Sequence, residues 1–70
     1  MTLSNTVEDY LLAIYGMRAD AEAVINARLA ERLHVAPPTV TATLERMVRD
    51  GHIWIDEGHQ VFLTLSGERS

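Results

Sequence analysis

Cysteine and lysine are both absent from this chain of 70 residues. Without cysteine, neither a disulfide framework nor a thiolate metal site can stabilise so short a chain, and a cysteine nucleophile is excluded. No histidine is paired with a carboxylate at a catalytic spacing, and no glycine-rich phosphate loop is present, so we expect neither an enzyme nor a small-molecule substrate. Basic leaders and long apolar runs are lacking too, which predicts a cytoplasmic protein without a membrane partner.

Positive charge is scarce and unevenly distributed. All six basic residues are arginine, against ten acidic residues, and the net charge is −4. This balance is unfavourable for nucleic-acid binding, in which phosphate contacts dominate affinity. Residues 24–55, however, hold four arginines and three acidic residues, whereas both flanks are acidic. The acidic N-terminal segment suggests that a divalent cation neutralises its charge.

Hydrophobic residues make up 47% of the chain, and their spacing predicts a single domain over residues 1–70. A first helix is expected from about residue 6 to residue 19, with Thr6 as its N-cap. A second helix has Asn26 as its N-cap and stops near His34, which tolerates a left-handed backbone. A third helix covers about residues 37–50, because proline is favoured in a first helical turn.

The third helix is expected to bury Val40, Leu44 and Met47 and to end at a left-handed Gly51. Beyond it the apolar residues recur with a period of two, which predicts a β-hairpin with Ile55 among its inward residues. Helix, tight turn, helix and hairpin in this order form the winged helix-turn-helix plan, a mainly α fold with a small β-hairpin. In that plan the helix after the tight turn enters the major groove of DNA.

The outward face of residues 37–50 is small, hydroxylated and free of negative charge in its N-terminal half. Threonine hydroxyls can bond to base edges, threonine and alanine methyl groups can contact thymine methyl groups, and the helix N-terminus can approach phosphate. Arginines of the second and third helices, Arg32 included, are candidate phosphate anchors. The alternative is a solvated face on which Glu45 pairs with Arg49. The residues predicted to bind DNA are Arg28, Ala36, Pro37, Pro38, Thr39, Thr41, Ala42, Arg46 and Arg49.

The hairpin tip, residues 56–59, is acidic where a DNA-contacting wing would be basic. A second hypothesis is therefore a winged-helix module that binds a protein rather than DNA. Salt-dependent binding to random duplex DNA would discriminate the two, because a phosphate contact weakens steeply with salt. The three histidines do not share a metal-binding spacing.

Four segments carry a resemblance to one family: TVEDYLLAIY at residues 6–15, RLAERL at 28–33, PTVT at 38–41, and Leu63-Thr64 with Gly67. Together, and at this spacing, they resemble the N-terminal domain of the diphtheria toxin repressor family of iron- and manganese-dependent regulators. The resemblance implies a homodimeric repressor that binds a palindromic DNA operator when a divalent metal is bound.

The resemblance also implies a metal site between the first helix and a downstream dimerisation domain. Asp9 falls where manganese-type members place a carboxylate ligand and iron-type members a methionine, so Mn²⁺ is favoured and Fe²⁺ is possible. Leu12 departs from the manganese type, in which a ligating glutamate can occupy that position. Most metal ligands are expected outside this chain, which is either a natural single-domain relative or a piece of a longer protein. An uncovered patch at Leu12 and Tyr15 fits the second case.

Overall fold

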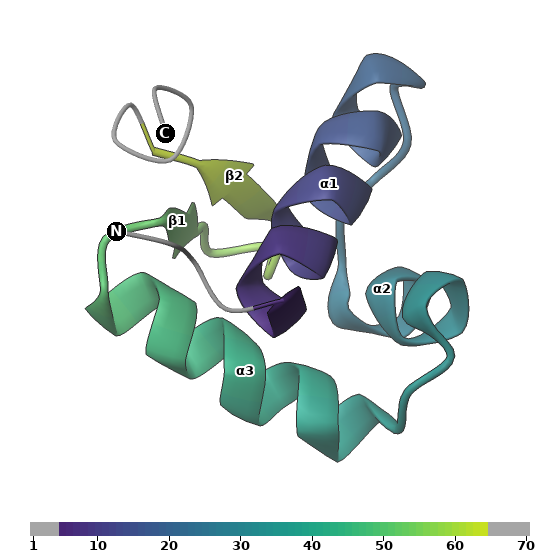
Figure 1. Cartoon of the computed structure of the whole chain (residues 1–70). Coiled ribbons are helices and arrows are strands. Elements are labelled where there is room, and N and C mark those ends of the chain that lie inside the picture. Colours follow the sequence, from purple (N-terminus) through teal and green to yellow (C-terminus); the bar gives the residue numbers. More distant parts are fainter. Residues whose placement is uncertain (1–4, 65–70) are drawn as a thin grey trace.

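The computed structural model of the protein describes residues 5–64. Its elements, in chain order, are α1 (Asn5–Ala19), α2 (Asn26–Leu33), α3 (Pro37–Arg49), β1 (Ile53–Ile55) and β2 (Val61–Leu63). The α3 helix crosses below α1 and α2, and the hairpin lies against α1 and the C-terminal end of α3 (Figure 1). The two strands pair antiparallel, with Trp54 opposite Phe62. The predicted winged helix-turn-helix arrangement is confirmed.

The turn between α2 and α3 is set by backbone conformation. His34 adopts the left-handed conformation, with φ of 58° and ψ of 46°, as predicted. The N–H of Val35 then donates to the carbonyl of Ala30 at 3.0 Å, which ends α2. Ala36 is extended, because the proline that follows it disfavours the helical region. Gly51, with φ of 82°, takes the predicted left-handed position after α3.

Three local predictions are wrong. Thr6 lies inside α1 rather than capping it, since the helix already includes Asn5. Asn26 is the first residue of α2, and Ile25 is the N-cap, with no side-chain hydrogen bond. Asn26 instead reaches across to α3, as described below. Ile55 is 37% exposed, although Val61, its partner on the opposite strand, is completely buried.

The core is formed where all elements meet. Ile14 of α1, Leu29 of α2 and Val40 of α3 are completely buried, and Leu44 and Met47 extend the predicted buried face of α3. The hairpin base belongs to the same cluster through Ile53 and Val61, and so does Val24 of the α1–α2 connection. The N–H of Val61 donates to the carbonyl of Val24 at 2.8 Å, so β2 is bonded on its outer side to that connection.

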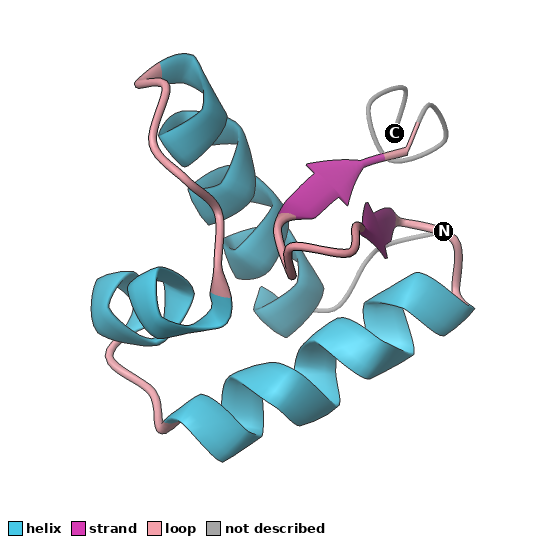
Figure 2. Ribbon diagram, turned by 180° about the vertical axis from the view of Figure 1, so that it is seen from behind, coloured by secondary structure: helices cyan, strands magenta, loops and turns pink. Residues whose placement is uncertain are grey.

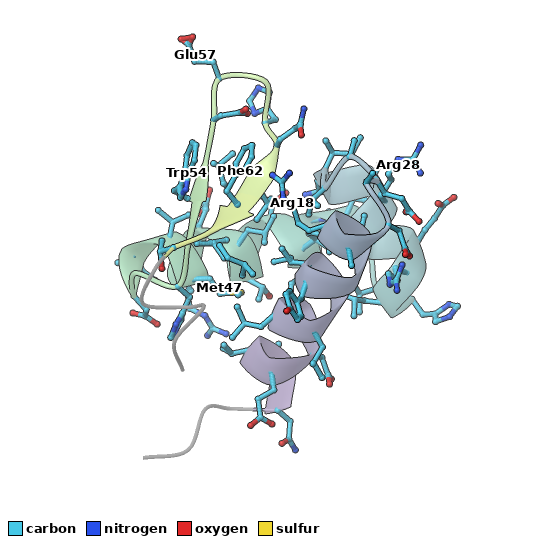
Figure 3. All side chains as sticks on the ribbon, turned by 90° about the horizontal axis from the view of Figure 1, so that it is seen from above. Arg18, Arg28, Met47, Trp54, Glu57 and Phe62 are labelled. Carbon is cyan, nitrogen blue, oxygen red and sulfur yellow. The ribbon has the colours of Figure 1, made fainter. Side chains whose placement is uncertain are left out.

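A stack of three side chains ties the hairpin to α1 (Figure 3). The Trp54 and Phe62 rings are parallel within 14°, with centroids 4.4 Å apart. The Arg18 guanidinium lies 3.8 Å from the centroid of Phe62 and donates to the carbonyl of Val61 at 3.1 Å. A cation over an aromatic face is attracted by the ring quadrupole, so the stack holds β2 against α1.

Candidate nucleic-acid interface

The outward face of α3 is exposed along its whole length, on the side away from α1 (Figure 2). Val40, Leu44 and Met47 hold the opposite face in the core. Thr43 is also buried, at 6% exposure, which the polar residue type did not reveal. A shallow depression is lined by Pro38, Thr39, Ala42, Thr43 and Arg46. Ala36, Pro37 and Thr41 are exposed beside it.

The first turn of α3 has few backbone donors for a phosphate. Pro37 and Pro38 have no N–H, and the N–H groups of Thr39 and Val40 both donate to the Ala36 carbonyl, at 2.9 and 3.2 Å. The first turn therefore has no free N–H group for a phosphate, and the approach of this helix N-terminus to phosphate stays a prediction. The exposed side chains at the start of α3 are small and apolar, apart from the threonine hydroxyls.

The two exposed threonine hydroxyls of α3 differ in their hydrogen bonding. The Thr41 hydroxyl donates to the Pro37 carbonyl at 3.2 Å and accepts from Nδ2 of Asn26 at 2.7 Å. The same Asn26 amide nitrogen is 3.4 Å from the Pro37 carbonyl. No side-chain hydrogen bond forms to Thr39 within residues 5–64. Of these two hydroxyls, only that of Thr39 has no intramolecular partner in this part of the chain.

The arginines lie on two helices and differ in their surroundings. Arg46 and Arg49 are exposed on α3, and no ion pair links Glu45 to Arg49 in the described part of the chain. Arg28 is 54% exposed and lies 4.0 Å from Glu22, a separation at which an ion pair is weak. Arg32 packs on α1, where a Cβ atom at Gly16 would lie 3.2 Å from its Nη2.

The wing tip carries negative charge away from the helices. Asp56 accepts a hydrogen bond from the N–H of Gln60 at 2.9 Å and so closes the turn. Glu57 stands at the very tip of the hairpin (Figure 3). Arg18, which lies beside the hairpin in this view, is engaged in the aromatic stack and in the hydrogen bond to the Val61 carbonyl. The hairpin tip is thus unsuited to a phosphate contact.

Asp9, the predicted metal ligand, is exposed on α1. Over residues 5–64, no three histidine or acidic side chains gather closely enough to hold a metal ion. Leu12 and Tyr15 are 69% and 66% exposed, which confirms the expected apolar patch on α1. Asp9 could supply one oxygen ligand to a metal, but a complete site would need further ligands.

The elements define a winged-helix DNA-binding domain: a helix and a three-residue turn are followed by a helix with small exposed side chains and then by the wing. Residues 2–57 match the family described as "Iron dependent repressor, N-terminal DNA binding domain", and the chain belongs to this family. It is 38% identical over 65 residues to the iron-dependent repressor IdeR of Mycobacterium leprae, and 37% identical to the diphtheria toxin repressor of Corynebacterium diphtheriae. Both alignments cover 93% of this chain.

The chain spans 28% and 29% of the lengths of these two relatives. A third relative, the diphtheria toxin repressor of Corynebacterium jeikeium, is 35% identical over the same share of this chain, which spans 27% of it. All three names describe repressors. Within residues 5–64, none of the helices combines the length and apolarity needed to cross a bilayer.

Proposed function

We propose that this chain reads double-stranded DNA through the exposed face of α3, as the DNA-binding domain of a metal-dependent transcriptional repressor. The observation that carries the proposal is the composition of the first two turns of α3. Every exposed side chain there is proline, threonine or alanine, and the first acidic residue is Glu45. Small side chains let the helix lie deep in the major groove, where their methyl groups contact thymine methyl groups.

Phosphate contacts would come from side chains, because the first turn of α3 has no free N–H groups. Arg46 and Arg49 on α3 and Arg28 on α2 are exposed and suited to this role. Since each neutralised phosphate contributes about −0.9 to the slope of log K against log salt concentration, three contacts predict a slope of roughly −3. These contacts would fix the register of α3 on the duplex without reading sequence.

A salt titration with a random duplex tests the proposal. Binding measured by fluorescence anisotropy should weaken with a slope of about −3, and Arg49→Gln should reduce the slope by about 1. Glu31→Gln, a change on the exposed surface of α2, is the control and should not lower the slope. Absence of salt-dependent binding would favour the alternative, in which the acidic wing binds a protein.

Metal dependence and dimerisation extend the proposal to the whole protein. The relatives named above as iron-dependent support regulation by a divalent metal. Asp9 would supply an oxygen ligand, which favours Mn²⁺, with Fe²⁺ as the alternative ion. We place the remaining ligands and the homodimer contacts outside residues 1–70, with a palindromic operator as the DNA partner. The bound metal would supply a fixed positive charge at the acidic start of α1.

A further inference from the structure

One polar contact joins the side chains of α2 and α3. It consists of Asn26, Pro37 and Thr41, and we call it the Asn26–Thr41 clamp. Among the side-chain hydrogen bonds of residues 5–64, no others link these two helices. The rest of the α2–α3 contact is apolar core, around Leu29 and Val40.

The donors and acceptors of the clamp determine which way the Asn26 amide points. The Pro37 carbonyl can only accept, so the Asn26 amide must turn its nitrogen, and not its oxygen, toward it. The same nitrogen then donates to the Thr41 hydroxyl. That hydroxyl has one hydrogen, which is directed at the Pro37 carbonyl. Thr41 therefore has no hydrogen left for a base edge while the clamp is closed.

The clamp restrains the orientation of α3 relative to α2, which the apolar part of their contact fixes only weakly. Apolar burial is non-directional and leaves a helix some freedom to roll on its neighbour, whereas a hydrogen bond weakens steeply with angle. The clamp acts at the first turn of α3, beside Pro38 and Thr39, which line the depression on the reading face. A small roll of the helix would move these side chains relative to the base edges.

We infer that Asn26 is a positioning residue for sequence reading: it acts through Thr41 to fix the first turn of α3, and the Thr41 hydroxyl serves this clamp and not a base contact. The inference rests on the proposed function. It predicts that loss of the clamp lowers discrimination between DNA sequences. Non-specific affinity should stay unchanged, because the exposed arginines are not part of the clamp.

The experiment uses a duplex selected from a random library by the wild-type chain, with a random duplex as reference. The measured quantity is the ratio of the two affinities, from fluorescence anisotropy. Asn26→Ala and Thr41→Val should each lower the ratio by about threefold to tenfold, the equivalent of one net hydrogen bond. The double variant should lose no more than either single variant, because both break the same clamp.

Thr39 provides the matched control, since its hydroxyl lies on the same face without an intramolecular partner in the described residues. Any effect of Thr39→Val should add to that of Asn26→Ala. Thr41→Ser keeps the hydroxyl and should retain the wild-type ratio. Melting followed by circular dichroism should show all variants folded, because the three residues lie outside the buried core.

Two results would overturn the inference. If Thr41→Val lowered the ratio equally with and without the Asn26 amide, Thr41 would contact DNA directly. If Thr41→Ser lost discrimination, its methyl group and not its hydroxyl would be the functional part. Failure of the wild-type chain to prefer its selected duplex would instead overturn the proposed function, and the inference with it.

Discussion

Replacement of Arg18 by methionine tests how firmly the wing is held to α1. Methionine keeps the apolar stem but removes the guanidinium, and with it the contact 3.8 Å from the Phe62 centroid and the hydrogen bond to Val61. A partly desolvated cation over an aromatic ring contributes about 1 kcal/mol. The half-buried charged hydrogen bond adds about 1 kcal/mol more. Arg18→Met should therefore lower the free energy of unfolding by roughly 2 kcal/mol.

Thermal unfolding provides the assay. For a domain of this size, a loss of 2 kcal/mol lowers the melting temperature by about 8–16 °C. Unfolding is followed by the fluorescence of Trp54, the single tryptophan of the chain, whose ring stacks on Phe62. Arg28→Met is the control: its weak ion pair with Glu22 is exposed, so its removal should change stability by less than about 1 kcal/mol.

A double-mutant cycle with Phe62→Leu isolates the contact itself. If Arg18 and Phe62 interact as the structure indicates, the two substitutions together should cost less than the sum of the single ones. Full additivity, or an Arg18→Met variant as stable as the wild type, would refute the reasoning. The stack would then contribute nothing measurable to the free energy of unfolding.

Three further predictions concern reading, folding and metal. Thr41→Asp should abolish specific DNA binding in an electrophoretic shift assay while the domain stays folded, since it places a negative charge on the exposed face of α3, where the phosphates of the duplex would repel it. Val40→Asp should unfold the domain by circular dichroism, because Val40 is completely buried and an unpaired charge there costs about 3 kcal/mol or more. A stable Val40→Asp variant would reverse the assignment of the faces of α3. Isolated residues 1–70 should bind Mn²⁺ weakly by titration calorimetry, and Asp9→Ala should leave the melting temperature nearly unchanged, because Asp9 is exposed and lies beyond the first turn of α1. Tight binding lost in Asp9→Ala would mean that the site is complete in this chain.

Features set by local sequence could be predicted. The buried face of α3 follows from the spacing of Val40, Leu44 and Met47 alone. The ends of α2 and α3 follow from the backbone preferences of single residues, His34 and Gly51. The exposed small face of α3 follows in turn, since residues opposite a buried stripe must face solvent.

Contacts between distant residues could not be predicted. Asn26 before an apolar periodic segment is typical of an N-cap, and nothing local indicates that its amide bonds Thr41, 15 residues away. Arg18 similarly meets Val61 across 43 residues. These side chains take positions that the packing of whole helices and strands decides, and periodicity carries no information about such pairs.

The wing has two parts with different roles. Its strands are joined to the body of the domain, in part by the hydrogen bond between Val61 and Val24, and its tip is not. Its base supplies Ile53 and Val61 to the core, so a chain cut before the hairpin would lose part of its interior and not merely an appendage. The tip, residues 56–60, supplies no buried side chain. Exposed loop tips tolerate exchange and insertion. Exchanges of exposed side chains at the tip should therefore cost little stability, whereas changes at the buried Ile53 and Val61 should cost more.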